Sequence, residues 1–247
     1  MLSKTVVKYI QSLSHKKFRE EYGVFVAEGP IVVAEILQQG SCDCKLICAT
    51  ESWVIENQKI ASACNSESVI SVSDIELSKI SQLQTPNKVV GVFYKKVCDE
   101  KPVVAGKVSL LLDDIQDPGN LGTIIRIADW NGIESIICSK NSADAYNLKV
   151  VQSTMGSIAR VSVYYSHLPD FLKEYEEMIS YAATLDGADL SIYKPIKEGF
   201  IIIGNEARGV SPEILSLSDY KITIPRFGNA ESLNAAVATG IILSHIR

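Results

Sequence analysis

The sequence predicts an α/β protein whose larger part is a mostly parallel sheet with helices on both faces. From Lys107 onward, apolar runs of strand length alternate with stretches of helical periodicity. These runs are apolar almost without interruption, which is typical of strands in a parallel sheet, because helices cover both of its faces. A shorter α/β pattern precedes Lys107 and predicts a separate small unit.

Composition is that of an ordinary soluble globular protein. The 247 residues are 47% hydrophobic and 21% charged, which suits one large domain or two small ones. No apolar stretch approaches the length of a membrane span, and the N-terminal MLSKTVVKYIQ lacks the features of a signal peptide. We therefore expect a cytoplasmic protein with no membrane association.

The chain is expected to divide into a domain over 1–95, a linker over 96–106 and a domain over 107–247. The linker contains charges, Pro and Gly and has no helical period. In the first domain the patterns predict helices over 3–13 and 30–39 and strands over 23–27, 45–49 and 89–94. In the second they predict strands over 109–112, 135–138, 179–184, 200–203 and 221–224, and helices over 121–130, 146–156, 167–178, 211–217 and 232–246.

Ligands of such sheets bind beyond the carboxyl ends of the strands, so the loops that follow strands are the candidate site. These loops are DDIQDPGNLG, LDGAD, GNEARGVSP and PRFGNAESLN. They contain no Gly-rich dinucleotide fingerprint, no P-loop, no metal-binding cluster and no nucleophile–base pair. The cysteine cluster CDCKLIC is better explained as a buried strand than as a zinc site. A reaction on a pre-activated small-molecule electrophile would need neither metal nor covalent nucleophile.

Arg126 is unusual because it lies within an otherwise apolar helical stretch. On a helical wheel Gly122, Arg126 and Asp129 share the narrow non-apolar side, and Arg126 leans toward Gly122 and Asn120. A guanidinium there could bind a phosphate or ribose oxygens. A surface pair between Arg126 and Asp129 explains the pattern equally well.

Two further helix starts lie in these loops. Ser211 and Pro212 are typical of a helix N-terminus, and Ser232 and Asn234 open the last helix, where one of them is expected to cap. Small residues in that helix suit close packing on the sheet or on a second subunit.

The N-terminal segment is basic, although the net charge of the chain is −5. It has no acid before Glu20, and it could contact phosphates locally or be a solvated helix face. Its basic side chains are Lys4, Lys8, Lys16, Lys17 and Arg19.

The segments DPGNLGTIIRIAD, GNEARGVSPEI and IPRFGNAESLNAAVA resemble, in order and spacing, the three motifs of the SpoU (TrmH) RNA 2′-O-ribose methyltransferases of the SPOUT superfamily. SADAYNLKVVQSTMGSIARV is similar to the middle of that domain, and KYIQSLSHKKFREEYGVFVAEGPIVVAEIL resembles the family's L30e-like substrate-binding extension. The resemblance implies a C-terminal trefoil knot, S-adenosylmethionine bound in the knot, and a homodimer.

The resemblance also implies roles for individual residues. Arg126 matches the catalytic arginine and Asn120 the residue that helps to place it, and Glu206, Ser232 and Asn234 match further polar site residues. The cofactor contacts that it implies are Thr184, Gly204, Asn205, Ile224 and Leu233. Ala207 departs from a common glycine, and Arg226 and Phe227 stand where an apolar residue is frequent.

The expected function is methyl transfer from S-adenosylmethionine to a ribose 2′-hydroxyl of structured RNA, with no metal. Ribosomal 23S RNA is the favoured substrate and transfer RNA the other possibility. We expect the N-terminal domain to dock this RNA through the phosphate contacts of Lys4, Lys8, Lys16, Lys17 and Arg19. The alternatives are an inactive RNA- or ribosome-binding protein of the same fold and a nucleotide-dependent oxidoreductase. The missing dinucleotide fingerprint disfavours the oxidoreductase.

Overall fold

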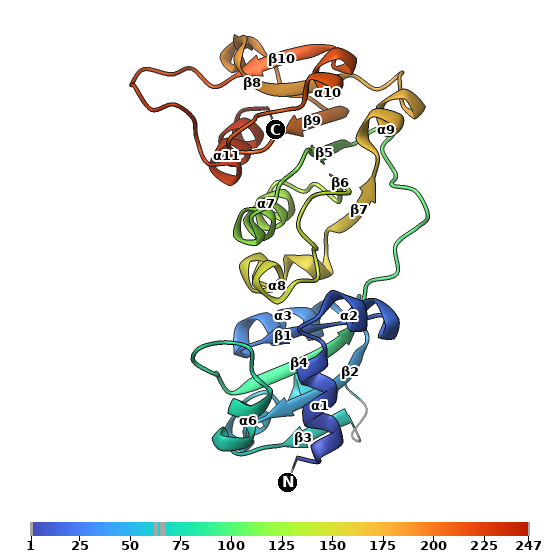
Figure 1. Cartoon of the computed structure of the whole chain (residues 1–247), viewed down its shortest axis with the longest axis vertical. Coiled ribbons are helices and arrows are strands. Elements are labelled where there is room, and N and C mark those ends of the chain that lie inside the picture. Colours follow the sequence, from blue (N-terminus) through green and yellow to red (C-terminus); the bar gives the residue numbers. More distant parts are fainter. Residues whose placement is uncertain (1, 62–63, 65–67, 247) are drawn as a thin grey trace. The chain divides into compact units, whose positions relative to one another are not determined.

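The computed structural model describes residues 2–61, 64 and 68–246, and the chain forms two compact units (Figure 1). The first unit comprises residues up to Cys98 together with Asp144–Arg160, and the second comprises Asp99–Ala143 and the chain from Val161 onward. The units differ from the predicted domains at 144–160. This segment comes from the middle of the second domain's sequence but packs within the first unit.

The first unit has one sheet of strand order β1-β4-β2-β3. β4 pairs antiparallel with β1 and β2, and β2 pairs parallel with β3. Its elements are α1 (Lys4–Ser12), α2 (Lys16–Tyr22), β1 (Val24–Glu28), α3 (Pro30–Gln39), β2 (Cys44–Ala49), α4 (Glu51–Glu56), α5 (Gln58–Ala61), β3 (Val69–Ser71), α6 (Asp74–Ile80), β4 (Val89–Tyr94), α8 (Leu148–Thr154) and the 3-10 turn η2 (Ser157–Ala159).

Local signals explain where these helices begin and end. The Ser3 hydroxyl accepts a hydrogen bond from the Val6 amide at the start of α1, and Ser73 and Glu76 form a reciprocal capping box at the start of α6. Gly23 has a φ of 64° and ends α2 in the left-handed conformation that glycine favours. α1 and α6 pack against the sheet, because Ile10 of α1 and Leu77 and Ile80 of α6 share one buried apolar cluster with Val92 of β4.

The second unit confirms the predicted fold class, because its sheet is parallel throughout, with strand order β10-β8-β9-β5-β6-β7. Its elements are β5 (Val108–Leu112), α7 (Pro118–Trp130), β6 (Ser135–Ser139), β7 (Ser162–Ser166), α9 (Leu168–Glu174), β8 (Ser180–Asp189), the 3-10 turn η3 (Leu190–Ile192), β9 (Gly199–Ile203), α10 (Pro212–Leu217), β10 (Tyr220–Thr223) and α11 (Ala235–Ile246).

Helices cover both faces of this sheet. α9 and α10 pack together over one face, with Phe171 and Ile214 against Leu111 and Ile202. α7 and α11 contact each other and form the second helical layer (Figure 1). Every residue of β5 and β9 is buried, because helices cover the sheet on both faces. This burial explains why the sequence of these strands is apolar almost without interruption.

β8 departs from a regular strand. Its pairing with β10 moves from Ala182 to Ala188 while β10 advances only from Lys221 to Ile222, so residues 183–187 leave the ladder. A Cβ on Gly187 would lie 2.6 Å from backbone atoms of Ile222, so only glycine fits there. The loop predicted after residue 184 is therefore an excursion within β8. The trefoil knot stays a prediction.

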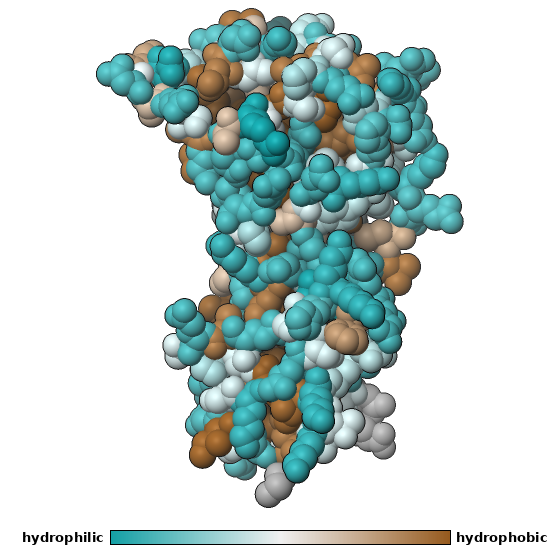
Figure 2. Space-filling model, viewed as in Figure 1, coloured by the Kyte–Doolittle hydropathy of each residue, from teal (hydrophilic) through white to brown (hydrophobic). Residues whose placement is uncertain are grey.

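No helix in the described part of the chain is long and apolar enough to cross a membrane. The face shown in Figure 2 is mostly hydrophilic, with exposed hydrophobic side chains in small groups.

Candidate active site

The candidate site lies at the reversal of strand order in the second unit. From β5 the chain proceeds to β6 and β7 on one side, whereas β9, β8 and β10 lie on the other side. β5 and β9 are neighbours that end in register at Leu112 and Ile203. The loops after these two strands therefore start side by side, at the position where open parallel sheets bind ligands.

Two aspartates join the loops after β5 and β9. The Asp113 amide donates to the Ile203 carbonyl at 2.9 Å, and its carboxylate accepts from the Ser211 amide at 2.8 Å. The Asp114 carboxylate forms an ion pair with Arg208. Asp114 has a φ of 60°, which few residues other than glycine, asparagine and aspartate adopt. These contacts fix each loop to the other rather than leaving either to solvent.

Asn205 holds the loop after β9. Its Oδ1 accepts from the amides of Ala207 at 2.9 Å and Arg208 at 3.2 Å, and its Nδ2 donates to the Asp114 carbonyl at 2.9 Å. Its backbone pairs with Gly209 in both directions. Asn205 therefore holds the loop in shape, and the polar atoms of its side chain are satisfied without a ligand.

The same loop requires glycine at 204. A Cβ on Gly204 would overlap the backbone of Gly209 and Val210. Ala207 lies outside the positive-φ region, so its departure from the common glycine introduces no backbone strain.

A chain of side-chain hydrogen bonds connects the three sequence motifs. Asn120 Nδ2 donates to Glu206 Oε1, and Asn234 Nδ2 donates to Asn120 Oδ1 at 2.8 Å. Asn234 Oδ1 accepts from the amides of Ala236 at 3.0 Å and Val237 at 3.3 Å, which caps α11. Asn234 is therefore the cap predicted for the last helix.

Asn120 is placed by the start of α7. Asp117 caps this helix by accepting from the Asn120 amide at 2.9 Å, and Pro118 occupies the first turn, where its missing N–H costs nothing. Asn120 thus projects from the first turn, next to the loops after β5 and β9.

Arg126 lies on the same helix, and its side chain is exposed. Within the part of the chain that the structure describes, it has no hydrogen bond and no ion pair, so the alternative pair with Asp129 does not form. It does not bond to Asn120 either, because the Asn120 amide is used by Glu206 and Asn234. Its guanidinium remains available to a ligand.

The segment 224–234 between β10 and α11 has no regular structure and is mostly exposed. Ile224 is half-buried, and Leu233 and Ser232 are exposed; Ser232 makes no hydrogen bond to a described residue. Within it Arg226 donates to the Ala230 carbonyl at 3.2 Å, and Phe227 is almost fully exposed.

Thr184 lies in the excursion of β8. Its hydroxyl oxygen is buried and has no hydrogen-bond partner among the described residues. A buried hydroxyl without a partner is costly, and a ligand that supplied a polar atom here would relieve the cost.

The basic N-terminal side chains differ in their surroundings. Lys4, Lys8, Lys16 and Lys17 are exposed. Arg19 is 4% exposed, donates to the carbonyls of Leu13 and Ser14, and pairs with Asp144 at 2.7 Å. The expectation that Arg19 binds RNA is therefore wrong, because its side chain is buried in the first unit and paired there with Asp144.

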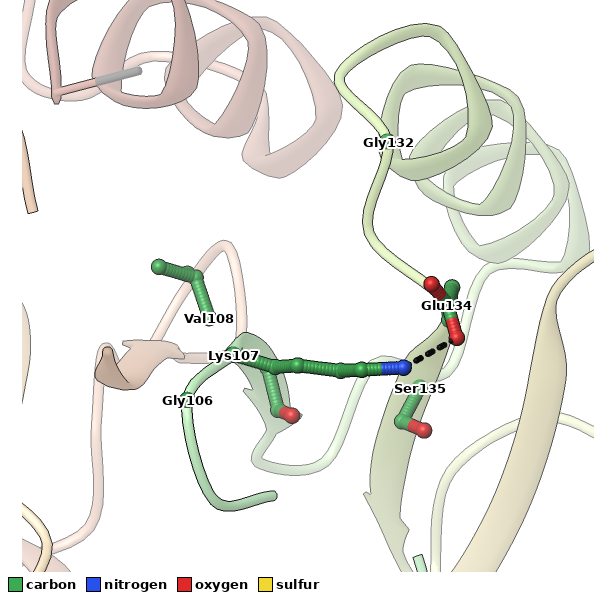
Figure 3. Close-up of a pocket in the computed structure, with 7 residues that line it drawn as sticks. Gly106, Lys107, Val108, Gly132, Glu134 and Ser135 are labelled. Carbon is green, nitrogen blue, oxygen red and sulfur yellow. Dashed lines mark hydrogen bonds and ion pairs between the residues drawn. The ribbon is translucent and has the colours of Figure 1, made fainter. Parts of the chain in front are cut away.

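A small cavity of about 200 Å³ lies elsewhere, at the amino ends of β5 and β6 (Figure 3). Lys107 extends across it and pairs with Glu134 at 2.5 Å. This is the edge of the sheet opposite the motif loops, so the cavity has no part in the candidate site.

Comparison with known proteins identifies the family. Residues 107–244 match the SpoU rRNA Methylase family, and residues 4–91 match the MRM3-like substrate binding domain. The chain belongs to the SpoU rRNA methylase family. It is similar to the 23S rRNA (guanosine(2553)-2′-O)-methyltransferase RlmP of Bacillus subtilis, with 32% identity over 98% of this chain and 95% of that protein.

Solved structures of family members share the fold of the whole chain. A putative RNA methyltransferase of the TrmH family from Porphyromonas gingivalis has 34% identity and a TM-score of 0.88, covering 100% of this chain and 98% of that one. The AdoMet-bound rRNA methyltransferase from Sinorhizobium meliloti has 31% identity and a TM-score of 0.86, covering 100% and 96%. The resemblance of the motifs to the SpoU family is thus confirmed.

Asp113, Asp114 and Arg208 were not among the predicted site residues. The sequence feature that could have identified them is the pair of acids, Asp113 and Asp114, which directly follows the apolar run of β5 at the strand end where ligands bind. The sequence does not show that these acids face the loop after β9, almost a hundred positions later.

Proposed function

We propose that this SpoU family protein transfers a methyl group from S-adenosylmethionine to a ribose 2′-hydroxyl of ribosomal RNA, with 23S RNA as the favoured substrate. The observation that carries the proposal is the hydrogen-bonded chain Glu206–Asn120–Asn234, which joins all three motifs, together with the unpaired Arg126 on the helix of Asn120. The names of the similar proteins, which are rRNA 2′-O-methyltransferases, support it.

The residues present fit the cofactor. The unpartnered Thr184 hydroxyl offers a polar atom, and Ile224 and Leu233 offer apolar contacts. S-adenosylmethionine supplies the methyl group on a sulfonium, which needs no further activation. Asn205 keeps the loop around Gly204 in shape.

The protein's own groups would act mainly by positioning the acceptor and stabilising charge. Arg126 would hold an RNA phosphate or the 2′-oxygen and stabilise the negative charge that develops on that oxygen. Guanidinium stays protonated in proteins, so Arg126 is assigned an electrostatic role rather than that of a base, and the proton of the 2′-hydroxyl passes to the substrate or to solvent. Asn120, Glu206 and Asn234 would keep the motif loops in one arrangement, with the Ser232 hydroxyl free for the substrate.

We also propose that the protein acts as a homodimer in the cytoplasm. Val237 and Ile241 are exposed on α11, and Trp130 is exposed at the end of α7, which α11 contacts. These apolar side chains suit burial by a second copy. Light scattering of the wild type and of Val237→Glu tests this; a monomeric wild type would contradict it.

Methyl transfer is tested with ribosomal RNA from cells that lack the gene, using labelled S-adenosylmethionine and mapping of ribose methylation. We expect one modified site with the wild type and none with Arg126→Ala, while calorimetry gives Arg126→Ala nearly wild-type cofactor affinity. Thr123→Ala, an exposed position one turn earlier on α7, is the matched control. Substantial transfer by Arg126→Ala would remove Arg126 from the mechanism, and absence of transfer by the wild type would contradict the proposed function.

A further inference from the structure

One end of the sheet in the first unit gathers tyrosines from three elements. Tyr94 ends β4 and pairs in register with Val24, the first residue of β1. Tyr22 ends α2, and Gly23 turns the chain from α2 into β1, with its carbonyl accepting from the Lys95 amide at 2.9 Å. Tyr9 of α1 meets Tyr22 edge to face, with ring centroids 5.4 Å apart. The turn at Gly23 therefore brings the ends of α2 and β4 together (Figure 1).

Lys45 lies among these rings because β2 is bulged there. The ladder between β2 and β4 shifts register between Cys44 and Leu46, which leaves Lys45 without a partner in it. Bulges redirect side chains and often occur at functional positions. The Lys45 ammonium is 5.1, 5.6 and 5.3 Å from the ring centroids of Tyr9, Tyr22 and Tyr94. We call Lys45 with these three rings the tyrosine box.

The tyrosine box is polar, charged and accessible. Tyr22 is 41% and Tyr94 is 42% exposed. Among the described residues Lys45 has no acidic partner, so its charge is not neutralised by a carboxylate. The acids nearest along the chain are Asp43 and Glu21; a third, Glu20, pairs with Lys16 at 3.6 Å. α1 and α2 add the exposed Lys4, Lys8, Lys16 and Lys17.

We infer that the tyrosine box binds an unpaired RNA nucleotide, with the base stacked on the exposed ring of Tyr22 or Tyr94 and the phosphate near Lys45. Aromatic rings beside cations are the usual means of binding single-stranded nucleic acid, because every base offers a flat face and every nucleotide an anion. A peptide partner is less well matched, since the cations around the box suit a polyanion. This inference rests on the proposed function and assigns one contact with the RNA substrate to the tyrosine box of the first unit.

The test uses the full-length protein and a short single-stranded RNA with a central 2-aminopurine, whose fluorescence is quenched by stacking. At least one of Tyr22→Ala and Tyr94→Ala should weaken binding by about 5- to 140-fold, the usual cost of one lost stack, and Tyr22→Phe and Tyr94→Phe should bind normally. Lys45→Gln should reduce the salt dependence of binding. The RNA paired into a duplex should bind all tyrosine variants equally, because its bases cannot reach a ring.

Tyr220→Ala is the matched control, because Tyr220 is 47% exposed and stacks on Tyr181 in the second unit. Wild-type affinity of both alanine variants for the single strand would overturn the inference. Should these variants fail to fold, photocrosslinking of 5-iodouridine RNA to the wild type replaces them, and absence of crosslinks at Tyr22 and Tyr94 would overturn it. Methyl transfer is measured on the same wild-type preparation. Transfer without stacking rejects the tyrosine box alone, and stacking without transfer rejects the proposed function alone.

Discussion

Asn234 donates a 2.8 Å hydrogen bond to Asn120, although the two residues are 114 positions apart in the chain. Each side-chain amide has its orientation fixed at both ends. Asn120 donates to Glu206, and Asn234 accepts from the backbone of α11. Bonds in such a chain polarise one another, so a change at one end affects the others.

Asn120→Asp should lower the rate constant of methyl transfer by about 100-fold or more, the usual effect of a misplaced site. The substitution keeps the size of the side chain but replaces the donor to Glu206 by a second carboxylate, which repels it. Single-turnover kinetics at saturating cofactor and RNA would measure this. Asn120→Asp with wild-type kinetics would show that the hydrogen-bonded chain is dispensable.

Gly204→Ala should destabilise the second unit by about 3 kcal/mol, the upper end of the range for overpacking. The new methyl group would overlap the backbone of Gly209 and Val210, which cannot move as a flexible side chain could. Gly228→Ala is the matched control, since a Cβ there meets nothing within 4 Å. Urea unfolding followed by circular dichroism compares the two. Equal stability of both variants would contradict the crowding at Gly204.

Neutralising Lys4, Lys8, Lys16 and Lys17 together should weaken RNA binding and reduce its salt dependence. Each lost phosphate contact lowers the slope of log affinity against log salt by about 0.7 to 0.9. Fluorescence anisotropy at several salt concentrations measures the slope. An unchanged slope would show that these lysines form an ordinary solvated face.

Arg19→Ala should instead act on stability. Removing one partner of its largely buried pair leaves Asp144 without compensation, which costs about 3 kcal/mol or more. Urea unfolding measures the loss. A fully stable Arg19→Ala variant with weakened RNA binding would restore the original expectation for this residue.

Glu28 should make the first unit less stable as pH rises. Burial raises the pKa of its carboxyl above the ordinary value of 4.5, although hydrogen bonds from Ser81 and Gln82 oppose the shift. The folded state therefore holds the proton more tightly than the unfolded chain does. This contribution to the free energy of unfolding is complete below about pH 4.5 and is lost as the pH rises through the folded pKa.

Glu28→Gln should remove that part of the pH dependence, because glutamine does not titrate and still accepts from the Gln82 amide. Unfolding from about pH 4 to about pH 7 compares it with the wild type and with Glu21→Gln, an exposed control in the same unit. Parallel pH profiles for Glu28→Gln and the wild type would contradict the prediction.

Hydrophobic pattern and capping chemistry predicted most of the second unit. The apolar runs at β5, β6 and β9 are buried strands, and the Ser-Pro pair does start α10 at Pro212. β7 was missed because its sequence SVYYS has only one aliphatic residue and its residues are not fully buried, so no aliphatic run marks it. Hydrophobic periodicity indicates which residues are buried, and an edge strand such as β7 buries few of its residues.

Long-range pairing explains the remaining differences. Wheel geometry could place Arg126 on an open face of α7, but it could not show that Asp129 fails to pair with it. Composition placed Arg19 with the other cations because its partner Asp144 is 125 positions away. Charges that meet only in the folded chain leave no local trace in the sequence.

The assignment of residues 144–160 to the first unit means that the chain passes between the units three times rather than once. The first unit is therefore not joined to the second by a single linker. A fragment cut after the predicted linker would retain Val150, Val151 and Ile158, which are buried in the intact chain, without the strand and helices that bury them. A chimaera that exchanges either unit between proteins would have to keep residues 144–160 with the first unit. In the sequence, however, this segment lies between motifs of the second unit.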